Sequence, residues 1–152
     1  MAFINKTNRT GSLEEIIGRK DDGSLLQGEL DIFKRIEKDC SNSRLDWYCW
    51  YDLILPIQNF DKHEIQIDFL LICEKGAIVL EVKGGGICVY DGHWYYSNKN
   101  GRLIEMDQSP FDQARRYKHA LIRRDILNKD ILMVEHAVAF PHQVMDVTNY
   151  KR

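Results

Sequence analysis

The stretch of residues 67–86, IDFLLICEKGAIVLEVKGGG, constrains the fold more than any other, because it sets two apolar runs on either side of a short polar turn. Runs of this length and composition predict two neighbouring β-strands. Each run nevertheless contains charge: Asp68 lies in the first, and Glu81 and Lys83 lie in the second. Because a buried, ionised carboxylate is costly without compensation, these three side chains require an explanation.

The register of the two strands decides where these charges lie. If residues 74–75 form a two-residue turn, Asp68 stands directly opposite Glu81, with Cβ atoms about 4.5–5.5 Å apart. Lys83 then joins them, since residues two apart on a strand share a face. A three-residue turn would instead place Asp68 opposite Val82 and send the two acids to opposite faces of the sheet.

A divalent cation between Asp68 and Glu81 would relieve both their repulsion and the cost of their burial. Carboxylate oxygens suit Mg²⁺ or Mn²⁺ better than Zn²⁺. Three glycines at residues 84–86 follow the lysine and leave the backbone open to a ligand. Metal and lysine together are the equipment of phosphodiester hydrolysis, in which positive charge stabilises the phosphate. The alternative is a buried ion-pair cluster that binds no metal.

The first helix is expected over residues 25–39, after an arm or short helix in residues 1–23. Ser24 is the predicted N-cap, and Gln27 completes a capping box. Glu29 falls on the buried stripe of this helix and should point toward the core. The other members of the stripe are Leu25, Ile32 and Ile36.

The remaining pattern predicts an α/β domain. Three strands are expected, over residues 46–56, 64–74 and 76–84. The Asp-Gly pair at 91–92 predicts a hairpin. A second helix should span residues 110–128, with Ser109 as its cap and Pro110 at its first position, and a last strand should cover 131–140. This order favours a mixed central sheet flanked by helices.

The composition is that of one globular domain, with 44% hydrophobic and 29% charged residues among 152. A formal net charge of −2 argues against a chain that wraps nucleic acid by bulk positive charge. No segment is apolar enough over about 18 residues to predict a membrane span. The four cysteines show no zinc-binding spacing and predict reduced thiols and a cytoplasmic location. They are Cys40, Cys49, Cys73 and Cys88.

The ordered motifs of the chain resemble those of a known family. IDFLLICEKGAIVLEVKGG resembles the D-x(n)-E-x-K core of the PD-(D/E)XK nuclease superfamily and, more narrowly, the nuclease-related domain, NERD. The similar segments are, in order, LLQGELDIF, EIQIDFLL, IVLEVKGG, DGHWYY, SPFDQA and HAVAFP. The resemblance implies a restriction-endonuclease-like core of α-β-β-β-α-β order over residues 24–152, which a longer protein could contain. One departure is the proline of the superfamily name, since Ile67 precedes Asp68.

The resemblance also implies roles for the charged residues. Asp68 and Glu81 would be metal ligands, and the carbonyl of Val82 would add another. Lys83 would be the catalytic lysine. Glu29 would correspond to the glutamate of the first helix, at the same catalytic and metal-binding site.

The second helix matches the Q-x-x-x-Y element of RecB-like members through Gln113 and Tyr117. These residues are four apart and share a helix face, so the amide is expected to contact phosphate or to position the metal site. Arg115, Arg116 and Lys118 make this helix the clear basic concentration of the chain. They are expected to grip backbone phosphates without reading bases, although a solvated helix face is the plainer alternative.

The sequence therefore predicts a deoxyribonuclease domain that uses Mg²⁺ or Mn²⁺ and acts on DNA of unspecified strandedness. The main alternative is a module that keeps the nuclease fold and binds nucleic acid or a partner protein without cutting. The resemblance implies a helicase or other ATPase module as a partner. Because the 152 residues contain no Walker-type motif, such a module is expected elsewhere in the same protein or in another subunit. A homodimer is also compatible with the sequence.

Overall fold

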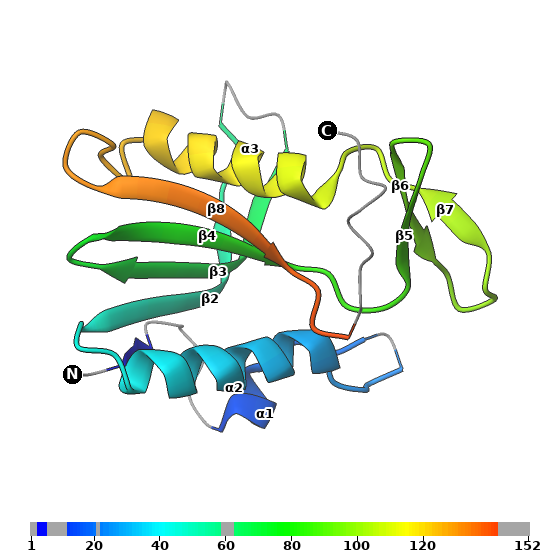
Figure 1. Ribbon diagram of the computed structural model, residues 1–152, viewed down its shortest axis with the longest axis horizontal. Coiled ribbons are helices and arrows are strands. Elements are labelled where there is room, and N and C mark those ends of the chain that lie inside the picture. The colour runs from blue at the N-terminus through cyan, green and yellow to red at the C-terminus, as the bar shows by residue number, and fades with distance from the viewer. Residues whose placement is uncertain (1–2, 6–11, 21, 59–62, 143–152) are drawn as a thin grey trace.

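The computed structural model describes residues 3–5, 12–20, 22–58 and 63–142 (Figure 1). The elements are, in chain order, β1 (Phe3–Asn5), α1 (Leu13–Ile16), α2 (Gln27–Ser41), β2 (Trp47–Leu55), β3 (Ile65–Cys73), β4 (Gly76–Val82), β5 (Ile87–Tyr90), β6 (His93–Ser97), β7 (Leu103–Glu105), α3 (Pro110–Arg123) and β8 (Met133–Ala139).

A five-stranded mixed sheet forms the centre of the structure, in the order β1-β2-β3-β4-β8. β3 is antiparallel to both of its neighbours, β2 and β4. The outer strands are parallel to theirs: β8 runs parallel to β4, and β1 runs parallel to β2. α2 lies on one side of this sheet and α3 on the other, and β5, β6 and β7 form a small second sheet beside them (Figure 1). The predicted α/β architecture, a mixed sheet flanked by helices, is confirmed.

The central hairpin has the register that a two-residue turn requires. Cys73 pairs with Gly76, and Phe69 pairs with Leu80. The same count sets Asp68 level with Glu81 at the end of the ladder. The prediction that the two acids share a face depended on this strand pairing, and the structure has it.

Two apolar cores lie on the two faces of the sheet. On the α2 side, the rings of Phe33, Tyr51 and Phe69 pack together with centroids 5.1–5.7 Å apart. On the α3 side, Val79 and Leu121 are fully buried in a second cluster. Burial of each such side chain contributes about 1.5–3 kcal/mol, so the two helices are held firmly on opposite faces.

β2 and β3 change sides near one of their ends. Tyr51 and Phe69 belong to the α2 core, but Leu55, Ile65 and Ile67 belong to the α3 core. The change occurs at Asp52, whose φ of 54° is in the left-handed region that Asp tolerates better than most residues. Asp68 lies opposite this bend, between the Phe69 and Ile67 pairs of the ladder. The acid therefore sits where the hairpin turns away from one core toward the other.

The predicted start of the first helix is wrong. α2 begins at Gln27 with Leu26 as its N-cap. The carbonyl of Ser24 accepts a hydrogen bond from the Lys20 N–H at 2.8 Å, and Leu25 forms an isolated bridge with Arg19, so both residues are held in a loop. The buried face of α2 consists of Gly28, Leu30, Phe33, Ile36 and Cys40, which keeps Ile36 of the predicted stripe but not Leu25 or Ile32.

The predictions for the second helix hold at its start and fail at its end. The Ser109 side chain accepts from the Asp112 N–H at 3.0 Å, which confirms the cap. The helix stops at Arg123 rather than near residue 128, because Asp125 takes a left-handed φ of 54°. The chain then folds back, and the Leu127 N–H donates to the Leu121 carbonyl at 3.2 Å.

Gly76 offers a test of the pairing between β4 and β8. A Cβ on Gly76 would lie 2.5 Å from the Met133 carbonyl oxygen of the neighbouring strand. Gly76→Ala should therefore lower the free energy of unfolding by about 1–3 kcal/mol in urea denaturation. Gly84→Ala is the matched control, because its Cβ would approach only the Gly28 Cα, at 3.8 Å. Equal stability of the two variants would contradict this pairing.

Candidate active site

The predicted acids and lysine meet at one end of the sheet. The carboxyl end of β4, the first turn of α2 and the first turn of α3 all lie at this end (Figure 1). Glu81 is only 3% exposed, and its Oε1 accepts a hydrogen bond from Lys83 Nζ at 2.7 Å. Its other oxygen, Oε2, is buried and has no hydrogen-bond partner within the described part of the chain. A buried acceptor of this kind is a point at which a cation or a water would be stabilised.

Asp68 is held against the backbone of β4. Its Oδ2 accepts from the Val82 N–H at 2.7 Å. Burial raises the pKa of Asp68, while the Val82 N–H and the charge of Lys83 act in the opposite direction. The Lys83 N–H donates to the Ala139 carbonyl at 2.9 Å, so β8 holds the end of β4 in place.

Glu29 comes to the same region from α2. Burial raises the pKa of Glu29 to about 7, and the negative charges of Asp68 and Asp52 add to the effect. Burial likewise raises the pKa of Glu81 to about 7, with Asp68 as the next cause and Lys83 in opposition. Because Glu29 and Lys83 also act on each other electrostatically, the structure brings the predicted acids and the lysine together.

Glycine allows this approach of α2. A Cβ on Gly28 would lie 3.1 Å from Pro141 Cγ and 3.3 Å from the Gly84 Cα. Such contacts are tighter than side chains normally make, so the first turn of α2 packs on the segment after Lys83 only because residue 28 has no side chain. The glycine run was predicted to leave the backbone open to a ligand. At Gly84 it is instead α2 of the same chain that approaches the backbone.

Asp52 and Tyr51 are neighbours of the site that the sequence did not reveal. The charge of Asp52 raises the pKa of both Glu29 and Asp68. The Tyr51 hydroxyl donates a hydrogen bond to Glu29 Oε2. In the sequence the two residues stand within an aromatic strand, and no spacing separates them from ordinary strand residues.

The chemical type of the acids suits a hard cation, whereas their arrangement in the structure does not form a complete metal site. Asp68 and Glu81 are neighbouring carboxylates, and Glu81 Oε2 is an unfilled acceptor. Among the residues that the structure describes, no group of three or more His, Cys, Asp or Glu side chains is arranged to hold a metal ion. The donor set therefore fits Mg²⁺ or Mn²⁺ in kind, with Asp68, Glu81 and Glu29 as the carboxylates that would hold it.

Gln113 lies in the first turn of α3. Its Nε2 donates to the Tyr117 hydroxyl at 2.9 Å, so the predicted pair is joined on one helix face. Tyr117 is 5% exposed and belongs to the α3 core. Its ring therefore packs against the sheet, and its hydroxyl orients the amide of Gln113.

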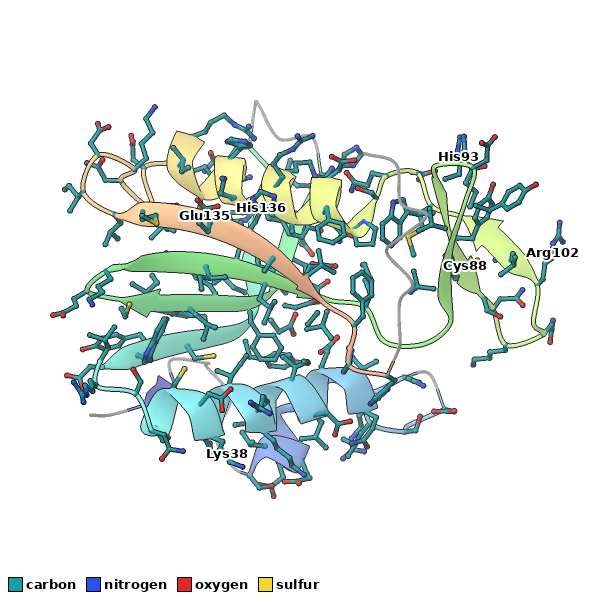
Figure 2. The ribbon with its side chains drawn as sticks, in the orientation of Figure 1. Lys38, Cys88, His93, Arg102, Glu135 and His136 are labelled. Atoms are coloured by element: carbon teal, nitrogen blue, oxygen red, sulfur yellow. The ribbon has the colours of Figure 1, made fainter. Side chains whose placement is uncertain are left out.

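The basic residues of α3 lie on two flanks of the helix. Lys118 Nζ lies 3.8 Å from Glu135 of β8, and the Arg115 and Lys118 charges contribute to lowering the pKa of His136, after burial. Glu135 and His136 lie beside α3 in Figure 2. Arg116 points to the other flank, where its guanidinium lies 5.4 Å from the centroid of the Tyr117 ring. The basic concentration read from the sequence is thus not a single stripe.

The comparisons with known proteins identify the family. The family model of the nuclease-related domain matches residues 24–141. The chain belongs to this family. The match includes every predicted site residue, from Glu29 to Lys118, and it supports a nuclease-related function for the NERD domain. Searches of the curated proteins and of the solved structures gave no match.

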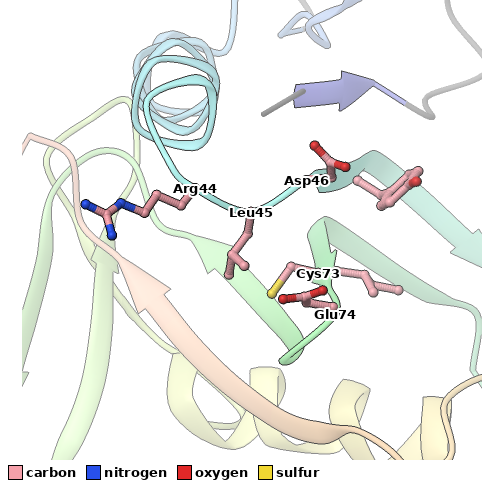
Figure 3. Close-up of a pocket in the computed structure, with 7 residues that line it drawn as sticks. Arg44, Leu45, Asp46, Cys73 and Glu74 are labelled. Atoms are coloured by element: carbon pink, nitrogen blue, oxygen red, sulfur yellow. The ribbon is translucent and has the colours of Figure 1, made fainter.

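A separate hollow of about 430 Å³ lies at the other end of β4 in the NERD domain (Figure 3). Arg44, Asp46, Cys73 and Glu74 are among the residues that line it. β4 has seven residues and spans about 20 Å, so the hollow is remote from Glu81. It is no part of the acidic site.

Within the described residues, no helix is long and apolar enough to cross a membrane.

The raised pKa values predict how the stability of the metal-free NERD domain changes with pH. Folded Glu29 and Glu81 have pKa values of about 7, above those of an unfolded chain, so the folded state binds more protons between about pH 4.5 and 7. Their contribution is fully present below about pH 4.5 and is lost as pH rises through 7. Over this range each carboxyl contributes at most about 3 kcal/mol.

The measurement is urea denaturation in chelator from pH 5 to 8. Glu81→Gln removes one of the two titrations, so this variant should gain stability over wild type as pH rises. Glu74→Gln, at the exposed turn of the same hairpin, should run parallel to wild type. A Glu81→Gln curve that is parallel to wild type throughout would contradict the assignment of the raised pKa.

Proposed function

We propose that this NERD domain hydrolyses phosphodiester bonds in DNA with the help of Mg²⁺ or Mn²⁺. The observation that carries the proposal is the state of Glu81, which is buried beside Asp68. One of its oxygens accepts from Lys83, and the other has no hydrogen-bond partner among the residues that the structure describes. If Glu81 served only as the partner of Lys83 in a structural ion pair, its second oxygen would be expected to have a hydrogen-bond partner too, because a buried acceptor without one costs free energy. A site that takes a ligand accounts for both.

The residues of the chain divide the work between them. Asp68, Glu81 and Glu29 would hold the cation, with the Val82 carbonyl as a further ligand. When bound, the cation would polarise the phosphate and lower the pKa of the attacking water. Lys83 is held by Glu81 at 2.7 Å and offers its ammonium to the negative charge that develops on the phosphate.

α3 would supply the contacts to DNA. Gln113, in the first turn of the helix, would face the site with its amide oriented by the hydrogen bond to Tyr117. Arg115, Arg116 and Lys118 follow directly and would bind backbone phosphates, which carry no sequence information. We therefore expect binding without strong base preference.

The wider setting belongs to the same proposal. We take residues 24–152 as the nuclease domain and residues 1–23 as its N-terminal arm, acting in the cytoplasm, where its free thiols stay reduced. A helicase or other ATPase module in the same protein or complex is the proposed partner, and a homodimer is the proposed alternative to a monomer.

Cleavage of single-stranded and duplex DNA tests the chemistry. With Mg²⁺ or Mn²⁺, Lys83→Ala and Glu81→Ala should each lower the rate by at least about 10²-fold, because each removes charge that stabilises the transition state. Lys75→Ala and Glu74→Ala are the matched controls, since these exposed residues form the turn of the same hairpin. Cleavage that persists unchanged in both site variants would disprove the proposal. Wild-type protein that binds DNA but cleaves nothing with either metal would favour the non-catalytic module.

The salt dependence of DNA binding tests the role of α3. In a Glu81→Gln background, which prevents cleavage, Arg115→Ala and Arg116→Ala should each weaken binding to all sequences alike. Each loss of a phosphate contact should reduce the slope of log K against log salt by about 0.7–0.9. Lys38→Ala is the control, because Lys38 is exposed on α2, on the opposite side of the sheet (Figure 2). A slope that falls equally for Lys38→Ala would contradict a specific role for α3.

A further inference from the structure

Tyr51 is a buried tyrosine that neither the family motif nor the proposed chemistry uses. It lies in β2 and is 4% exposed. Its ring packs against Phe33 of α2 and Phe69 of β3, with centroids 5.7 and 5.1 Å away. These contacts fix the position of the ring, and with it the position of the hydroxyl.

The hydroxyl of Tyr51 acts both as a hydrogen-bond acceptor and as a hydrogen-bond donor. It accepts from the Gly18 N–H at 3.0 Å and donates to Glu29 Oε2. A phenol has a single proton, so its one donor capacity is spent on Glu29. Burial raises the pKa of Tyr51 above its usual value, and the bond to Glu29 adds to this, so the hydroxyl remains a donor.

The Gly18 contact comes from a segment that precedes the family match. Residues 24–141 match the NERD model, and Gly18 lies before them. Its neighbours Ile16 and Ile17 are buried in the α2 core, which anchors the segment. A Cβ on Gly18 would lie 3.3 Å from the Tyr51 hydroxyl and 3.1 Å from Leu26 Cδ1. The backbone N–H reaches the hydroxyl because this position has no side chain.

We propose that Tyr51 is a positioning residue of the active site: its hydroxyl, held by the Gly18 N–H, fixes the Glu29 carboxylate through Oε2 and leaves Oε1 as the oxygen that would hold a cation. This inference rests on the proposed nuclease function. A glutamate on a helix has several rotatable bonds, and a ligand that must be ordered on binding lowers affinity. Residues that orient metal ligands typically change metal affinity or activity 10–100-fold when they are removed.

Tyr51→Phe is the direct test, because phenylalanine keeps the ring between Phe33 and Phe69 and removes only the hydroxyl. Calorimetry with Mn²⁺ should show an affinity about 10–100-fold below wild type. The kcat for DNA cleavage should fall with it, while KM stays near the wild-type value, because the DNA contacts of α3 are unchanged. Tyr48→Phe, on the same strand, is the matched control and should keep wild-type affinity.

A double-mutant cycle separates positioning from general damage to the fold. If Tyr51 acts through Glu29, adding Tyr51→Phe to Glu29→Ala should cause no further loss of Mn²⁺ affinity. A merely structural role would weaken the Glu29→Ala protein as well. Gly18→Ala supplies a second route, since its Cβ crowds the hydroxyl, and it should also lower Mn²⁺ affinity.

The outcomes distinguish this inference from the function on which it rests. Wild-type protein that neither binds Mn²⁺ nor cleaves DNA would remove the proposed function, and the role of Tyr51 with it. Wild-type binding that Glu29→Ala weakens and Tyr51→Phe leaves unchanged would overturn the positioning role alone. If Tyr51→Phe does not fold, unchanged Mn²⁺ affinity in folded Gly18→Ala would overturn it instead.

Discussion

The ion pair between Lys83 Nζ and Glu81 Oε1, 2.7 Å long, stands at the end of β4 where the sheet would otherwise bury bare negative charge. Two carboxylates, Glu81 and Asp68, lie level with each other there, and one ammonium serves both electrostatically. Asp68 also accepts a hydrogen bond from the Val82 N–H. Glu81 is less well satisfied, since its Oε2 has no hydrogen-bond partner in the described residues. Burial raises the pKa of Glu81 to about 7, and the negative charge of Asp68 is the next cause.

The rest of the fold keeps these carboxylates in place. The left-handed backbone of Asp52 turns the ends of β2 and β3 from the α2 core to the α3 core, so that Asp68 lies at the bend. Gly28 lets α2 approach the segment after Lys83, and this approach carries Glu29 to the acids. β8 holds the end of β4 through the Ala139 carbonyl. Together these contacts hold Asp68, Glu81 and Glu29 at the same end of the sheet.

How much of the structure can be predicted from the sequence depends on how far apart along the chain the interacting residues lie. The sequence left two registers open for β3 and β4, and the structure has the one that a two-residue turn requires. The cap at Ser109 was predictable because it joins residues only three apart in the chain. The inward direction of Glu29 survived an error of two residues in the start of α2, since the phase of a helix does not depend on where it begins. The error itself arose because loop hydrogen bonds from Lys20 compete with the cap at Ser24.

Features that depend on distant segments stayed hidden for a physical reason. Asp52 takes its left-handed φ where β2 passes from one core to the other, and the neighbouring aromatic residues give no sign of it in the sequence. The helical phase of α3 separates Arg116 from Lys118, but only the strand order shows that β8 and Glu135 lie under the Lys118 flank. The bond from Gly18 to Tyr51 joins residues 33 apart. A motif read along the chain therefore finds the residues that would touch the phosphate, whereas the residues that orient them belong to the three-dimensional packing and extend outside residues 24–141.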